Sequence, residues 1–200
     1  MKRRKTKSLE LEPVTIHHQV AVGGRVVDAA SKRPIPGARV RITGKGALPT
    51  QEFTTTNSGY YYFIDLPDGA YELHAWHGAG GTRRGQARNR AKVARDPEGN
   101  LPSLFLDLPL VQTTVSGSVT ATGKRPVMMA QVRIQGSGEQ AFTNADGQYW
   151  LRGVEKGNRT LRVTAQGFKQ SDHPVRVIEV GGECTVDIRL ERANPTPQAQ

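Results

Sequence analysis

Short runs of alternating apolar and polar residues occur along most of the chain. Residues 38–43, ARVRIT, alternate in this way, and from residue 16 to residue 26 the even-numbered positions are apolar, small or neutral. Alternation with a period of two is typical of β-strands that bury one face. Turn-forming residues separate the runs, as at 57–59 (NSG) and 67–69 (PDG). The pattern predicts many short strands and has little helical periodicity.

The pattern occurs twice. Residues 33–44, RPIPGARVRITG, recur as residues 125–136, RPVMMAQVRIQG, and residues 56–63, TNSGYYYF, recur as residues 144–151, NADGQYWL. A repeat unit of about 90 residues has the size of a domain rather than of a solenoid repeat. About seven short strands in each copy, separated by frequent turns, are typical of a Greek-key sandwich. The sequence therefore predicts an all-β protein of two tandem seven-stranded Greek-key β-sandwiches.

The repeat and the composition of the chain ends divide the chain into four segments. Residues 1–13 are charged and carry no sustained pattern, so we expect a flexible basic arm. The two sandwiches are expected at residues 14–111 and 112–192, and residues 193–200 as a disordered polar tail. No stretch approaches the ~20 apolar residues of a membrane span, and the basic start lacks the apolar run of a secretory signal. We therefore expect a cytoplasmic protein, or part of a particle assembled in the cytoplasm.

The net charge of +10 is concentrated in two places. One is the arm, and the other is the segment where the two copies diverge, which is longer and more basic in the first copy. Without the eleven cations of these segments, 17 basic residues remain against 18 acidic ones. Residues 78–85 are expected to form a flexible glycine-rich loop, and residues 86–93 are compatible with a strand. The cations are Lys2, Arg3, Arg4, Lys5 and Lys7 in the arm, and Arg83, Arg84, Arg88, Arg90, Lys92 and Arg95 in the divergent segment.

These cations are the main functional signal of the sequence. With Trp76 beside them, they predict a site for a protein partner with an acidic surface. The alternative is sequence-independent and salt-dependent binding of a polyanion, nucleic acid or an anionic membrane, through the arm and the 76–95 loop. Trp76 alone is a small stacking platform for a single-strand binder. A third interpretation is that both segments are solvated and bind nothing; no small-molecule substrate is indicated.

The residues at the turns resemble those of the carboxypeptidase regulatory-like domain, a transthyretin-like β-sandwich. The family pattern runs G-x-V-x-D, P-[IL]-x-G-A-x-V-x-[IV]-x-G, T-[DN]-x-x-G-x-Y-x-[FL] and G-x-Y-x-L. The first copy follows it over residues 24–73, and the second over residues 117–161, with Met129 in place of a glycine and Arg159 in place of a tyrosine. The resemblance covers roughly residues 20–192. It implies two seven-stranded sandwiches of a type that occurs as non-catalytic modules beside peptidases, receptors and assembly proteins.

Candidate catalytic and metal-binding residues are few. His74 and His77 are three residues apart, which places them on opposite faces of a strand, and no Cys, Asp or Glu accompanies them at zinc-like spacing. Asn144 and Asp146 are interpreted as part of a turn rather than as a calcium site. Cys184, the single cysteine, is interpreted as a small strand residue. The sequence predicts no catalytic residue, no metal site and no cofactor.

A remote alternative is a metalloenzyme similar to the intradiol dioxygenases. Those enzymes share a G-x-Y-x-F…P-G-x-Y stretch, which residues 59–71 resemble, and they bind iron(III) through two tyrosines and two histidines. The R-P-x-H-I-H segment of the family is replaced here by AWHGAGGTRRG. We therefore expect a non-enzymatic structural or interaction module, an accessory subunit of a larger bacterial or phage-like assembly.

Overall fold

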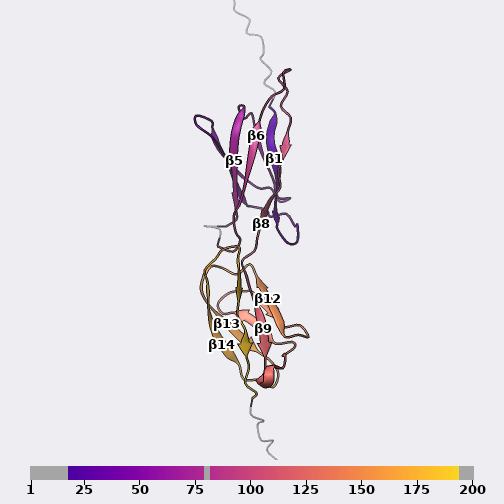
Figure 1. The fold of residues 1–200 in the computed structure, drawn as a ribbon, viewed down its shortest axis with the longest axis vertical. Helices are drawn as coiled ribbons and strands as arrows, with labels where there is room; N and C mark the ends of the chain where they lie inside the picture. The colour runs from indigo at the N-terminus through magenta and orange to yellow at the C-terminus, as the bar shows by residue number, and fades with distance from the viewer. Residues whose placement is uncertain (1–17, 79–81, 194–200) are drawn as a thin grey trace, which may run out of the picture.

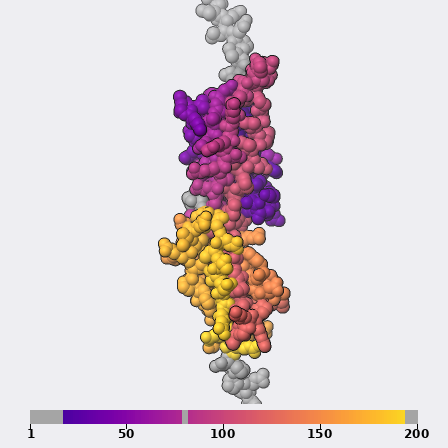
Figure 2. Space-filling model, in the orientation of Figure 1, coloured from indigo at the N-terminus to yellow at the C-terminus, as the bar shows by residue number. Residues whose placement is uncertain are grey.

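The computed structural model describes residues 18–78 and 82–193, which form two bodies of β-sheet lying end to end (Figures 1 and 2). Within these residues the regular elements are strands, apart from one 3-10 turn at Thr122–Lys124, and no helix is long and apolar enough to cross a membrane. The predicted all-β class is confirmed. The predicted basic arm and residues 194–200 of the predicted tail lie outside the described residues.

Domain 1 is a sandwich of two sheets. One has the strand order β4-β1-β7, with β8 also paired to β1, and the other has the order β3-β2-β5-β6. β7 and β8 follow one another along β1 and run parallel to it, so they form one interrupted last strand and bring the count to the predicted seven. The strands are β1 (Val20–Asp28), β2 (Arg39–Gly44), β3 (Thr50–Thr54), β4 (Tyr60–Ile64), β5 (Gly69–Trp76), β6 (Ala87–Val93), β7 (Leu104–Phe105) and β8 (Leu108–Leu110).

Domain 2 repeats this topology. Its sheets have the orders β12-β9-β15, with β16 also paired to β9, and β11-β10-β13-β14. The last strand is again interrupted and parallel to the first. The strands are β9 (Thr114–Thr120), β10 (Gln131–Ile134), β11 (Gln140–Phe142), β12 (Gln148–Arg152), β13 (Gly157–Thr164), β14 (Ser171–Val177), β15 (Glu183–Thr185) and β16 (Ile188–Arg189).

Each domain has its own hydrophobic core between its two sheets. In domain 1 the alternation of β2 places Val40 and Ile42 inside, where they share the core with Leu73, Tyr61 and Phe63. The residues between them in the sequence consequently point to the outside of the sheet. The pattern of hydrophobic positions thus decides which side chains are available to a partner.

The interruption of the last strand results from a close approach of two main chains. In domain 1 a Cβ atom on Gly24 would lie 2.0 Å from the carbonyl oxygen of Leu106. The buried hydroxyl of Tyr61 donates a hydrogen bond to that carbonyl, and the carboxylate of Asp107 accepts one from the backbone N–H of Arg25. The same arrangement recurs in domain 2, with Gly117, Val186, Tyr149, Asp187 and Ser118 at the corresponding positions.

A buried carboxylate lies at the end of domain 1 that faces domain 2. Asp28 accepts hydrogen bonds from the backbone N–H groups of Ala30 and Ser31 and from the side chains of Arg84 and Gln112. Burial would raise the pKa of Asp28, but hydrogen bonds from Ser31, Gln112 and Arg84 hold it well below its usual range. The carboxylate therefore joins the end of β1 to the glycine-rich segment, of which the structure describes residues 82–85, and to the linker between the domains, residues 111–113.

The linker, residues 111–113, is hydrogen bonded on both sides. On one side Gly85 N–H donates to the carbonyl of Val111 over 2.8 Å, and Thr113 N–H donates to the carbonyl of Arg83 over 3.0 Å. On the other side the carbonyl of Thr113 accepts from Val154 of domain 2 over 3.1 Å. Residues 82–85 were expected to belong to a flexible loop; instead they are paired with the linker, because its unpartnered main-chain groups need hydrogen bonds.

Arg83 connects the glycine-rich segment directly to domain 2. Its guanidinium forms ion pairs with Glu139 and Glu155 and donates a hydrogen bond to the carbonyl of Gly153 over 3.0 Å. Burial would raise the pKa of Glu139, but hydrogen bonds from Ser137, the main chain and Arg83 outweigh it, so the pKa is lowered. The positive charge of Arg83 is thus compensated by carboxylates of the same chain.

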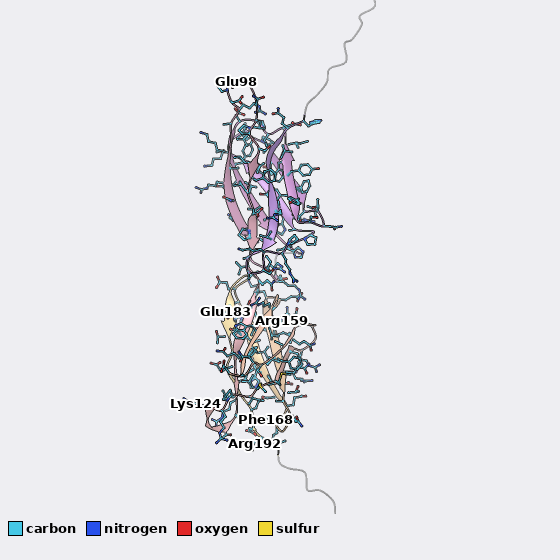
Figure 3. The ribbon with its side chains drawn as sticks, turned by 90° about the vertical axis from the view of Figure 1, so that its right-hand side faces the viewer. Glu98, Lys124, Arg159, Phe168, Glu183 and Arg192 are labelled. Atoms are coloured by element: carbon cyan, nitrogen blue, oxygen red, sulfur yellow. The ribbon has the colours of Figure 1, made fainter. Side chains whose placement is uncertain are left out.

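Two glycines meet where the domains are closest. A Cβ atom on Gly181, whose φ is +79°, would lie 2.7 Å from Cα of Gly85. The two main chains touch without side chains between them, which fixes the separation of the domains at this point. The far ends of the molecule are marked by Glu98 in domain 1 and by Lys124, Phe168 and Arg192 in domain 2 (Figure 3).

Replacing Gly24 by alanine is expected to destabilise domain 1 by about 3 kcal/mol, because the new methyl group would overlap main chain that cannot move without breaking the pairing of β1. Gly23→Ala is the matched control, since its Cβ atom would have its nearest neighbour at 3.4 Å. Urea unfolding of both variants measures the difference. Equal losses of unfolding free energy would contradict the role of the close approach.

Replacing Gly181 by alanine is expected to change the relative orientation of the domains. Gly167→Ala is the control, because Gly167 has a φ of +80° and no atom within 4 Å of its Cβ position. Both variants carry a similar backbone strain of about 1 kcal/mol, but only Gly181→Ala disturbs the contact with Gly85. Residual dipolar couplings of the two domains measure the orientation, and an unchanged orientation in Gly181→Ala would contradict the prediction.

Candidate functional site

The described cations of the divergent segment lie in three places. Arg83 and Arg84 are at the junction of the domains, Arg88, Arg90 and Lys92 are on β6, and Arg95 follows β6. The arm residues Lys2, Arg3, Arg4, Lys5 and Lys7 lie outside the described residues. The expected 76–95 loop is in fact divided, because β6 pairs with β5 and buries Ala87, Ala91 and Val93.

The three cations outside β6 have acidic partners within the chain. Arg83 pairs with Glu139 and Glu155, and Arg84 pairs with the buried Asp28. Arg95 pairs with Asp68 and donates a further hydrogen bond to the carbonyl of Leu66 over 3.2 Å. The positive charge that the sequence attributes to this segment is therefore largely compensated at both of its ends.

The cations of β6 lie on the outer face of the β3-β2-β5-β6 sheet. Arg88 is opposite His74 and Arg90 is opposite Glu72 in the register of β5 and β6. The side chains of Arg88, Arg90 and Lys92 point to the same face because they occupy every second position of the strand, and Ala91 between the last two is buried. Arg90 is paired with Glu72 over 3.6 Å, but its side chain remains 84% exposed.

Two further arginines reach the same face from β2. Arg39 is opposite Trp76 and Arg41 is opposite His74 in the register of β2 and β5. Arg39 and Arg41 were not predicted as site residues, although their alternation with Val40 and Ile42 predicted that they are exposed. The missing information was the strand order, which brings β2 and β6 to the two sides of β5.

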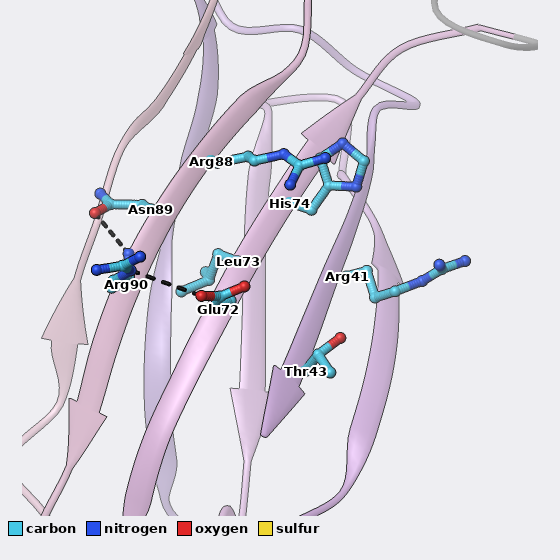
Figure 4. Close-up of a pocket in the computed structure, with 8 residues that line it drawn as sticks. All are labelled: Arg41, Thr43, Glu72, Leu73, His74, Arg88, Asn89 and Arg90. Atoms are coloured by element: carbon cyan, nitrogen blue, oxygen red, sulfur yellow. Dashed lines mark hydrogen bonds and ion pairs between the residues drawn. The ribbon is translucent and has the colours of Figure 1, made fainter. Parts of the chain in front are cut away.

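We call this surface the basic face and define it as Arg39, Arg41, His74, Trp76, Arg88, Arg90 and Lys92. A depression of about 390 Å³ lies on it, lined by residues of β2, β5 and β6 (Figure 4). Two carboxylates share the outer side of the sheet: Glu52, which is paired with Arg41 over 3.0 Å, and Glu72. Five cations against two carboxylates leave the face positively charged.

The only aromatic residue of the basic face besides His74 is already in contact with its neighbours. The guanidinium carbon of Arg41 lies 5.3 Å from the centroid of the Trp76 ring, and the ring of His74 lies 5.0 Å from it. His74 in turn is hydrogen bonded to the side-chain oxygen of Gln86 over 2.7 Å. Trp76 is half-buried in this cluster. The Trp76 ring therefore holds Arg41 of β2 in place, and it is not free to stack against a base.

The corresponding face of domain 2 is not basic in the same way. The registers of β10, β13 and β14 place Thr164 at the position of Trp76 and Asp172 at the position of Arg88. Asp172 is paired with Arg162 over 2.8 Å. Arg133 and Arg176 stand at the positions of Arg41 and Lys92, so domain 2 keeps part of the positive charge but lacks the tryptophan and the unbroken row of cations on the outer strand.

The two tyrosines that resemble iron ligands of the dioxygenases are engaged in structural hydrogen bonds. The hydroxyl groups of Tyr61 and Tyr71 donate to the main-chain carbonyls of Leu106 and Pro67. Cys184 is half-buried in β15. Within residues 18–78 and 82–193, no group of three or more His, Cys, Asp or Glu side chains is arranged to hold a metal ion.

Comparisons with solved structures give distant similarities. The Bacillus anthracis TIE protein has a TM-score of 0.45 and 16% identity, over 86% of this chain and 34% of that one. The shaft pilin SpaA of Lactobacillus rhamnosus GG has a TM-score of 0.43 and 14% identity, over 92% of this chain and 100% of the pilin. GBS52, the minor pilin of Streptococcus agalactiae, has a TM-score of 0.38 and 15% identity, over 92% and 99%. The chain thus spans about a third of the length of the TIE protein.

No match was found among curated proteins. The family model of the carboxypeptidase regulatory-like domain matches residues 21–96 and residues 114–191, which is most of the chain and one match in each domain. The glycines and tyrosines that carried the resemblance occupy the turns and the close approach described above. This chain belongs to the carboxypeptidase regulatory-like domain family and contains two tandem copies of that domain.

Proposed function

We propose that this protein is a non-enzymatic interaction module that binds an acidic surface of a protein partner through the basic face of domain 1. The observation that carries the proposal is the gathering of Arg39, Arg41, Arg88, Arg90 and Lys92 on one sheet face. Sheet faces and edges of small sandwiches are suited to binding proteins, because their side chains are held in a fixed spacing by the strands. Charge complementarity would direct encounter and register.

Nucleic acid is the alternative ligand for the same face. It is supported by the number of cations, since each could neutralise one phosphate. It is opposed by two features of the basic face: Glu52 and Glu72 would repel phosphates, and Trp76 is occupied by Arg41 and His74 rather than free for stacking. We therefore favour a protein partner.

The second domain has a different part in the proposed function. The hydrogen bonds of the linker and the ion pairs of Arg83 hold domain 2 at a set position relative to the basic face. A protein in which one domain binds and the other is held rigidly to it can bridge two neighbours at a defined distance. We propose that the chain serves in this way as an accessory subunit of a larger bacterial or phage-like assembly.

Neutralising Arg88, Arg90 and Lys92 together by glutamine is expected to weaken binding of a fluorescent octaglutamate peptide about tenfold. Three exposed ion pairs of about 0.5 kcal/mol each correspond to that factor. The control is the triple variant Lys124→Gln, Arg125→Gln and Arg189→Gln, which changes the net charge equally but lies on domain 2. Fluorescence anisotropy at fixed salt measures both affinities.

Equal weakening in the two triple variants would contradict the proposed site, because it would show that only net charge matters. A single-stranded oligonucleotide that binds more tightly than the peptide, with a steep fall in affinity as salt rises, would favour the nucleic-acid alternative.

A further inference from the structure

Strand β6 is the outer strand of its sheet, and within residues 18–78 and 82–193 no strand pairs with its other edge. In such a strand, successive residues direct their backbone N–H and C=O groups alternately toward the neighbouring strand and away from it. The N–H of Arg90 donates to the side-chain oxygen of its neighbour Asn89 over 2.8 Å (Figure 4). It therefore points away from β5, and by the alternation the main-chain groups of Arg88 and Lys92 do the same.

The same edge of domain 2 is blocked by a proline. In β14, Pro174 is opposite Thr160 of β13, and in β6, Arg90 is opposite Glu72 of β5. Glu72 and Thr160 occupy equivalent positions in the two domains. Each directly precedes a leucine that lies opposite the isoleucine of the second strand: Leu73 opposite Ile42, and Leu161 opposite Ile134. Pro174 thus occupies the position of Arg90. A proline there removes the outward N–H and prevents a further strand from pairing.

We propose that the free edge of β6 binds an extended acidic segment of the partner as an additional strand of the sheet. The inference rests on the proposed function and names the part of the partner that is recognised. Main-chain hydrogen bonds to Arg88, Arg90 and Lys92 supply the pairing, with a carbonyl of the segment replacing the side-chain oxygen of Asn89 on the N–H of Arg90. The carboxylates of the segment, at alternate positions, lie beside the three cationic side chains, because both sets of side chains point to the outer face.

The charges also explain why this edge is left open. Exposed edge strands are protected from pairing with copies of themselves by charged residues, above all by cations. Two β6 edges brought together would set Arg88, Arg90 and Lys92 of one copy against those of another, which is unfavourable. An acidic segment meets no such barrier. In domain 2, where Asp172 stands at the position of Arg88, the cationic row is broken and the proline takes over the protection.

The test compares two peptides of equal charge on the full chain. The first alternates, Glu-Val-Glu-Thr-Glu-Val-Glu, and the second has the same sequence with a methyl group on every backbone nitrogen, which removes all of its main-chain donors and so prevents pairing in either strand orientation. The unmodified protein is expected to bind the alternating peptide at least tenfold more tightly. Hydrogen exchange of the backbone amides of Arg88, Arg90 and Lys92 is expected to slow only with that peptide.

Two substitutions at one position separate charge from pairing. Arg90→Gln removes the charge but keeps the outward N–H, and is expected to weaken binding of the alternating peptide a few fold. Arg90→Pro removes both and is expected to weaken it at least tenfold, with the fold kept, because domain 2 holds a proline at this position. Unfolding curves check the fold, and the two-peptide comparison on unmodified protein does not depend on either variant.

Equal affinities for the two peptides, or equal effects of Arg90→Gln and Arg90→Pro, would overturn strand addition. If binding of both peptides were then still lost in the Arg88, Arg90 and Lys92 triple variant, the proposed function would stand without it. If neither peptide bound the unmodified protein, the inference would be wrong.

Discussion

A single buried carboxylate, that of Asp28, connects three separate parts of the chain near the junction of the domains. Asp28 stands at the last residue of the central strand β1 and is hydrogen bonded to Arg84 and Gln112. Through it the first strand of domain 1, the glycine-rich segment and the interdomain linker are held in one network. Removing one member would leave a buried charge without compensation, which is far more costly than losing an exposed ion pair. The contacts to domain 2 are then made by the neighbouring Arg83, through its ion pairs with Glu139 and Glu155.

The two copies share one scaffold but differ in a few residues at its surface and at the junction. Both keep the glycine, the tyrosine and the aspartate that shape the interrupted last strand, since that arrangement is needed for the sandwich itself. They differ at the end of the first strand and at the outer edge of the second sheet. Ala121 stands in domain 2 where Asp28 stands in domain 1, and Pro174 stands where Arg90 stands. The differences between the copies therefore carry more functional information than their similarities.

The fold was largely predictable from the sequence because alternation and turn residues are local signals. The same alternation already indicated that Arg39 and Arg41 are exposed. What it could not indicate is their closeness to Arg88, since neighbours in a sheet depend on strand order and not on sequence distance. The partners of Arg83, 56 and 72 residues away, were hidden for the same reason. A dense run of cations in a sequence consequently overstates the free charge of the folded surface.

The parallel pairing of the first and last strands has a mechanical consequence. In domain 1, β1 begins at the end of the domain far from the junction, and β8 ends at the junction with domain 2 (Figure 1). The two strands are parallel neighbours. A pull along the long axis of the molecule therefore draws the two strands past one another. Their hydrogen bonds are loaded together in shear rather than opened one after another. Domain 2 repeats the geometry with β9 and β16, so tension would meet two such shear clamps in series.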